Sequence, residues 1–282
     1  MNKQFELCTN PESGICQANQ ALSTNNTRGI TENGKMKAGS LKKLSLLLFF
    51  LGAALTVSPE VQAQQQSTVY LGSAGSYAVL AGTTVTNTGN SIVNGNLGVW
   101  PGTAVTGFGP GKVNGTEDAG DAAAQHAQAS LDIAFKDAAG RTSVNINNIA
   151  GDLSGRVLAP GLYKSTSTLS LTGTVSLSGK GVYIFQIASG LTVGNGGTVV
   201  LSGGADSANV FWQVGSSATL GTTADFKGTI LALTSISLAT NAKLDGRALA
   251  QHGAVTLDTT SVTLPLTNAV LIVLPPAPPN RD

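Results

Sequence analysis

The chain has 282 residues, of which 11% are charged, and its formal net charge at pH 7 is +1. This near-neutral balance argues against a protein that binds nucleic acid or an anionic membrane surface by electrostatic attraction. With 35 glycines and only 5% aromatic residues, the composition favours an extended β protein over a helical one.

The N-terminal part of the chain predicts export. Residues 1–35 are polar and are interpreted as a leader or, because Met36 follows them, as the result of a mis-assigned start. Residues 36–63 resemble a signal peptide: two lysines precede the apolar run 44–57, and a small-residue cleavage site ends at Ala63. We therefore expect a secreted protein, extracellular or at the cell surface.

Cysteine usage is consistent with this division. Cys8 and Cys16 both precede the predicted cleavage site, so the mature chain would have no disulfide and would depend on packing. Residues 64–265 are predicted to form one β-solenoid domain. Residues 266–282 are predicted to be an apolar and then proline-rich C-terminal tail.

The first part of the predicted domain contains short apolar runs. Glycine and asparagine interrupt these runs between residues 69 and 113, as the corners of stacked coils require. If Val85 points inward, Thr84 and Thr86 point outward and extend any outward column of hydroxyls.

A helix is predicted over about residues 116–139. Thr116 is a suitable N-cap, an alanine-rich segment follows, and Gly140 is a natural stop. The predicted buried stripe consists of Ala127, Leu131, Ala134, Phe135 and Ala138. A helix of this length fits lengthwise along a stack of coils.

One pattern returns five times between residues 166 and 265, at intervals of roughly 20 residues. Each copy reads apolar, hydroxyl, apolar, which is the pattern of a strand with one face buried. Stacked as parallel strands, the copies place their hydroxyl residues in one outward column. The column consists of Ser170, Thr192, Thr219, Ser237 and Thr256.

The positions beside this column are also small. One flank consists of Thr168, Gly190, Ser217, Ser235 and Ala254, and the other of Thr172, Gly194, Gly221, Ala239 and Asp258. Of the fifteen positions in the three columns, fourteen are Gly, Ala, Ser or Thr. An ordinary solvated sheet carries long charged side chains, so this pattern predicts a flat, stiff, mildly polar face.

Each coil is expected to contain two further strands, which gives a triangular cross-section. The second strand is solvated and carries Lys227 and Asp245, which can pair across neighbouring coils. The third strand is apolar on both sides and is therefore expected to lie under the helix.

Several segments together resemble the secreted microbial ice-binding (antifreeze) proteins. The matching segments are 71–74, 77–81, 95–99, 106–108, 138–141, 160–163, 182–186, 209–214 and 246–251. The resemblance covers about residues 69–265. It implies a mainly β fold, a right-handed parallel β-helix built as a discontinuous solenoid, with one long α-helix packed along one face. Residues Thr103 to Thr106 also fit a Thr-Ala/Gly-X-Thr/Asn motif of some members.

The resemblance further implies adsorption to ice through one flat face, with thermal hysteresis and inhibition of ice recrystallisation. The candidate ice-contacting residues are Thr84, Thr86, Thr168, Ser170, Thr172, Thr192, Ser217, Thr219, Ser235, Ser237 and Thr256. The expected partner is the ice surface. We expect no nucleic acid, no membrane contact by the mature chain, no cofactor and a monomer.

An extracellular adhesin or surface structural β-solenoid is the alternative, because the low charge and proline-rich tail suit it. A polysaccharide-active enzyme needs clustered carboxylates in a groove, which the sequence does not place on one face, so we expect no enzyme. His126 and His252 lack metal-ligand spacing, and Asp206, Asp225, Asp245 and Asp258 lack the spacing of a calcium loop, so no metal is expected.

Overall fold

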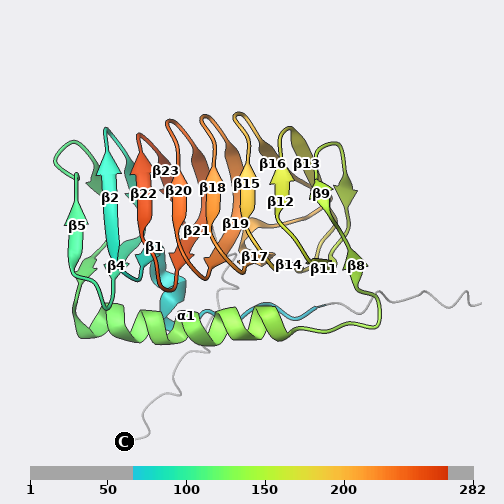
Figure 1. Cartoon of the computed structure of the whole chain (residues 1–282), viewed down its shortest axis with the longest axis horizontal. Coiled ribbons are helices and arrows are strands. Elements are labelled where there is room, and N and C mark those ends of the chain that lie inside the picture. The colour runs from blue at the N-terminus through green and yellow to red at the C-terminus, as the bar shows by residue number, and fades with distance from the viewer. Residues whose placement is uncertain (1–65, 266–282) are drawn as a thin grey trace, which may run out of the picture. The chain divides into compact units, whose positions relative to one another are not determined.

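The computed structural model describes residues 66–265. The predicted leader, signal peptide and tail (1–35, 36–63 and 266–282) and both cysteines lie outside the described residues. Parallel strands stack into a β-helix, and one long helix runs along it (Figure 1). The predicted fold class is therefore confirmed.

One side of the β-helix is an eight-stranded sheet in which neighbouring strands pair in parallel. Its strands are very short, and five of the eight consist of the predicted apolar-hydroxyl-apolar triplet or extend it by one residue. In spatial order they are β5 (Ala104–Thr106), β2 (Thr84–Thr88), β22 (Val255–Asp258), β20 (Ile236–Leu238), β18 (Ala218–Leu220), β15 (Leu191–Val193), β12 (Leu169–Leu171) and β9 (Gly151–Asp152).

A 15-stranded sheet forms the two remaining sides. The second side contains β10 (Val157–Leu158), β13 (Thr174–Ser178), β16 (Thr198–Ser202), β23 (Ser261–Thr263), β3 (Ile92–Asn94) and β6 (Lys112–Val113). The helix side contains β8 (Asn147–Asn148), β11 (Gly161–Ser165), β14 (Tyr183–Ile187), β17 (Val210–Val214), β1 (Tyr77–Ala81), β4 (Asn96–Val99) and β7 (Glu117–Ala119). Short 3-10 helices, η1 (Gly72–Ser76) and η2 (Ser207–Asn209), lie outside these strands.

Two strands run through the corner between the second side and the helix side. The sequence predicts separate strands here, but β19 (Asp225–Ala232) and β21 (Lys243–Ala250) are each continuous. Gly228 has φ +107°, and a Cβ on Gly246 would lie 1.9 Å from the Gly228 carbonyl oxygen. Only glycine allows the two backbones to bend together without losing their pairing.

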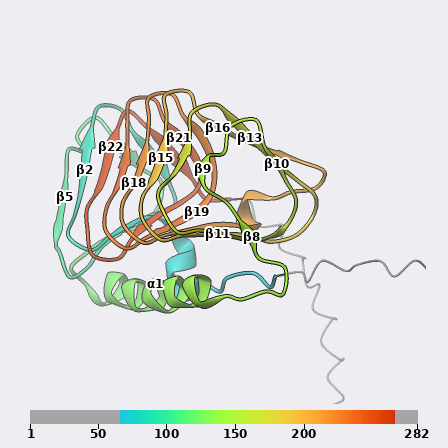
Figure 2. The ribbon, with the colours of Figure 1, turned by 45° about the vertical axis from the view of Figure 1, so that its right-hand side comes forward.

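The stacking order differs from the chain order. Strands β1, β2 and β3 of an early coil pair with β21, β22 and β23 of the last coil. On their other edges they pair with β4, β5 and β6. The early coils therefore extend the stack beyond its C-terminal coil, which is the discontinuity that the resemblance implies. The chain between β7 and β8 must travel back along the stack, and the helix makes this connection (Figures 1 and 2).

An aromatic stack fills the middle of the coils. The ring centroids of Tyr163 and Phe185 are 5.0 Å apart, and those of Phe185 and Trp212 are 3.8 Å apart. The ring centroids of Trp212 and Phe226 are 4.9 Å apart. Trp212 Nε1 donates a hydrogen bond to the Lys227 carbonyl at 2.9 Å. Large rings in contact from coil to coil hold the strands of successive coils in register.

The helix α1 spans Ala122–Gly140, so its predicted start was wrong. Thr116 is not its N-cap, because the next residues pair as β7 with β4 and Gly120, at φ +73°, then turns the chain. Asp121 is the cap and accepts a hydrogen bond from the Ala124 amide at 2.9 Å. Ala127, Leu131, Ala134 and Ala138 are buried as predicted, and Phe135 is partly buried. No helix within residues 66–265 is long and apolar enough to span a membrane.

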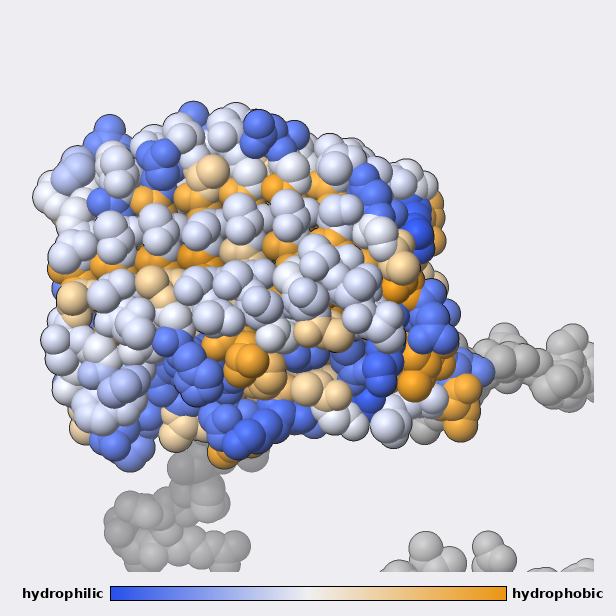
Figure 3. Space-filling model, in the orientation of Figure 1, coloured by the Kyte–Doolittle hydropathy of each residue, from blue (hydrophilic) through white to orange (hydrophobic). Residues whose placement is uncertain are grey.

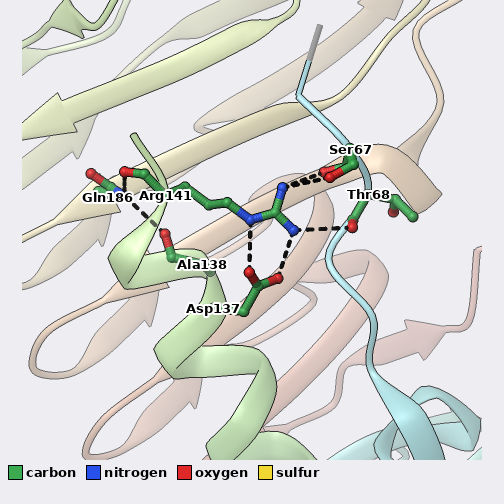
Figure 4. Close-up of polar contacts among 6 residues, drawn as sticks. All are labelled: Ser67, Thr68, Asp137, Ala138, Arg141 and Gln186. Carbon is green, nitrogen blue, oxygen red and sulfur yellow. Dashed lines mark hydrogen bonds and ion pairs between the residues drawn. The ribbon is translucent and has the colours of Figure 1, made fainter. Parts of the chain in front are cut away.

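The C-terminal end of α1 is fixed by side chains from other elements (Figure 4). Nε2 of Gln186 on β14 lies 2.9, 3.1 and 2.8 Å from the carbonyl oxygens of Ala138, Ala139 and Arg141, which share its two N–H donors. Arg141 pairs with Asp137 and donates to oxygens of Ser67 and Thr68. These bonds satisfy carbonyl groups that a helix end leaves unpaired, and they hold the helix against the coils.

We predict that Gln186→Leu destabilises the fold by about 1–3 kcal/mol, because the carbonyls at the helix end lose the two N–H donors of a buried amide. Gln125→Leu, on the exposed face of the same helix, should change stability by less than about 0.5 kcal/mol. Urea denaturation followed by circular dichroism measures both. Equal effects of the two changes would contradict this role for Gln186.

Candidate functional site

The hydroxyl residues of the eight-stranded sheet form a straight column. Ser170 lies in register with Thr192, and Thr192 with Thr219. The register continues through Ser237 to Thr256. Their apolar neighbours on each strand are buried, whereas the hydroxyl residues are exposed or half-buried. The alignment predicted from the sequence is confirmed, and we call the outward surface of this sheet the hydroxyl face and this row the central column.

Two N-terminal strands lengthen the central column. Thr86 lies in register with Thr256, and Thr106 with Thr86. Thr106 is exposed but was not among the candidate residues, although the Thr-Ala-Val-Thr segment that it ends was a signal for it. Thr84 pairs with Ala104 and is half-buried in a flanking row. Eight strands spaced by about 4.8 Å give the column a length of roughly 34 Å.

The opposite end of the column is charged. Asp152 on β9 lies in register with Ser170, a position that the sequence analysis did not identify. Its carboxylate accepts hydrogen bonds from the Thr172 hydroxyl and from the Ser154 hydroxyl, the latter at 2.7 Å. These two bonds hold the pKa of the Asp152 carboxyl well below its usual range. Thr172 was predicted to contact ice, but its hydroxyl is engaged with this carboxylate.

The rows on either side of the central column also consist mostly of residues with short side chains or none. Backbone hydrogen bonds between successive coils align Gly190, Ser217, Ser235 and Ala254 on one flank and Gly194, Gly221 and Ala239 on the other. Thr168 is exposed and donates to the Ser189 hydroxyl at 3.2 Å. Ser217 and Ser235 are half-buried. In Figure 3 this face shows rows of residues of intermediate hydropathy, and the strongly hydrophilic residues gather towards its margins.

Asp258 was the one charged residue among the fifteen predicted positions. It lies at the corner of the sheet, where the Thr240 hydroxyl donates to its Oδ2 at 2.5 Å and the Thr259 hydroxyl to its Oδ1 at 3.2 Å. Both carboxylate oxygens are thus held by neighbouring hydroxyls at the rim of the face.

The second side has a different chemistry. Lys227 and Asp245 are register neighbours as predicted, but the ion pair forms within β19, between Lys227 and Asp225 at 2.7 Å. These residues and Lys243 line an open depression. Charged side chains and uneven relief make this side an ordinary solvated surface.

The two histidines lie on different elements, α1 and the segment after β21. His126 is exposed on α1, and His252 is exposed after β21. Asp206 caps η2 by accepting from the Ala208 amide at 2.9 Å. Within residues 66–265 there is no group of three His, Cys, Asp or Glu residues placed to hold a metal ion.

The low pKa of Asp152 predicts a pH-dependent contribution to stability. An unfolded aspartate titrates near about 3.9. Because the folded pKa is lower, the carboxylate stabilises the fold fully above about pH 4, and this contribution is lost as the pH falls through the folded value. We predict that Asp152→Asn lowers Tm at pH 7 and that its difference from the wild type shrinks below about pH 4.

Thermal unfolding at several pH values measures this effect. Glu117→Gln, at an exposed carboxylate of β7, is the control and should leave the Tm difference small throughout. A Tm difference for Asp152→Asn that stays constant between pH 7 and about pH 2 would contradict a contribution from the charged carboxylate.

Comparison with known proteins gives consistent matches. The family model described as Ice-binding-like matches residues 79–263. The ice-binding protein of Nostoc sp. (strain HG1) is 44% identical over 210 residues, which are 72% of this chain and 77% of that protein. The ice-binding protein of Flavobacterium frigoris (strain PS1) is 38% identical over 212 residues, 70% of this chain and 76% of that protein.

The fold is also similar to a solved structure. A crystal structure of an ice-binding protein from an Antarctic biological consortium aligns with a TM-score of 0.72 at 47% sequence identity. The alignment covers 73% of this chain and 95% of that chain.

Proposed function

The chain belongs to the Ice-binding-like family, and from this premise we propose that it adsorbs to ice crystals through its hydroxyl face. The observation that carries the proposal is the central column, in which seven Ser and Thr residues from Thr106 to Ser170 lie in unbroken register. The other two sides are less suitable, because one carries charged side chains and the other is covered by α1.

Ice presents a repeating surface of water molecules and has no individual site that a protein could bind strongly. Binding therefore depends on many weak contacts that a rigid body makes at the same time. Parallel strands repeat by about 4.8 Å, a spacing close to that of oxygen atoms in the ice lattice. Threonine hydroxyls then anchor surface water, and threonine methyl groups together with Gly and Ala restrain it.

Adsorption of this kind changes how a crystal grows. Molecules held on the ice front make it curve between them, which lowers the freezing point and slows recrystallisation. The proposed consequences are thermal hysteresis and inhibition of ice recrystallisation. The face is an exposed sheet with short side chains, so the proposed activity is binding and not catalysis.

The remaining expectations enter as parts of the proposal. We propose that the protein is exported after cleavage near Ala63 and acts outside the cell as a monomer with no membrane contact. Export is supported by the signal-like segment 36–63.

We predict that Thr219→Tyr reduces thermal hysteresis roughly tenfold, because one protruding ring in the middle of the column prevents simultaneous contact by its neighbours. Thr174→Tyr places the same ring on the second side, where Thr174 is exposed on β13, and should keep wild-type hysteresis. Nanolitre osmometry of purified residues 64–282 measures the freezing gap. Circular dichroism checks that both variants fold.

Two results would count against the proposal. If both tyrosine variants keep full hysteresis, the hydroxyl face is not the binding surface. If the wild-type protein shows no hysteresis and no effect on recrystallisation, an adhesin or structural role is favoured instead.

A further inference from the structure

The central column is not uniform in height. Its five threonines are all exposed, namely Thr86, Thr106, Thr192, Thr219 and Thr256. Its two serines, Ser170 and Ser237, are half-buried and therefore less accessible than these threonines. Serine lacks the γ-methyl group of threonine, so each serine leaves a low place in the row of methyl groups.

The two serines differ in position. Ser237 on β20 lies between Thr219 and Thr256, so threonines flank it on both sides. Ser170 lies next to Asp152, near the charged end of the column. A missing methyl group at Ser237 therefore interrupts the column in its interior, whereas one at Ser170 lies where the column already changes chemistry.

We propose that Ser237 limits the ice affinity of the hydroxyl face, because it divides the threonine row into one group of three residues and another of two. The inference rests on the proposed function and adds a specific residue to it. Surface water over Ser237 meets a hydroxyl but no methyl group at the height of the row. The ordered water layer is therefore interrupted at this strand, and the two groups of threonines act less cooperatively.

The fold accommodates threonine at this position. The same register position holds threonine on five other strands of the sheet, so the backbone geometry and the outward direction suit it. Threonine also has a higher β propensity than serine and a stiffer χ1. The change Ser237→Thr therefore tests binding without a cost in stability.

The experiment compares three variants by nanolitre osmometry at equal concentration. Ser237→Thr should raise thermal hysteresis about 1.5-fold, because contacts in rigid register act together. Ser237→Ala removes the hydroxyl without adding a methyl group at that height, and should give less hysteresis than the wild type. Ser176→Thr makes the same chemical change on the second side, where Ser176 is half-buried on β13, and should have no effect.

The outcomes separate this inference from the proposed function. If Thr219→Tyr reduces hysteresis as predicted but Ser237→Thr leaves it unchanged or lower, the hydroxyl face is supported and the role of Ser237 is overturned. A rise in Ser237→Ala equal to that in Ser237→Thr would also overturn it, since no methyl group is restored. Absence of hysteresis in the wild type would overturn both.

Discussion

The structure depends on the in-register stacking of parallel strands. Five of the coils contribute a triplet whose two apolar residues point inward and whose central residue points outward, and the backbone ladder repeats this arrangement at nearly constant spacing. A shift of one residue on any strand would turn its hydroxyl inward and its apolar residues outward. Burial of the apolar residues thus fixes the register of each strand, and the register determines which hydroxyl residues point outward.

The helix provides the connection that the stacking order of the coils requires. Because early strands such as β2 extend the stack beyond β22, the chain must run back along the coils before it enters β8. An α-helix satisfies its own backbone hydrogen bonds, and a stripe of alanines and Leu131 lets it lie closely on the apolar helix side. Gln186 and Arg141 then fix its far end to β14 and to the segment before η1. The helix covers one side of the coils and leaves the hydroxyl face free.

The three sides show how small changes in side-chain length separate their roles. On the second side, Lys227 and Asp225 reach out and pair in solvent. On the helix side, outward Leu and Phe residues are buried under α1. On the hydroxyl face, residues end at the β or γ atom, and the two carboxylates in or near the rows, Asp152 and Asp258, are tied to neighbouring hydroxyls. A surface of this kind offers many equivalent weak contacts and no single strong one, which suits a repeating ligand lattice.

The sequence by itself determined the period-two triplets, their coil-length repeat and the small residues beside them, and these local patterns predict the parallel strands and the column from Ser170 to Thr256. These patterns can be recognised in the sequence because the same order of buried and exposed residues recurs in successive coils. The sequence also predicted the outward direction of Thr86. Only the tertiary structure decided that Thr86 lies beside Thr256, that Thr106 follows it, that Asp152 ends the column and that Thr116 precedes a strand and not the helix. Those features depend on pairing between strands far apart in the chain, such as β2 with β22 and β7 with β4. Local periodicity carries no information about such pairing.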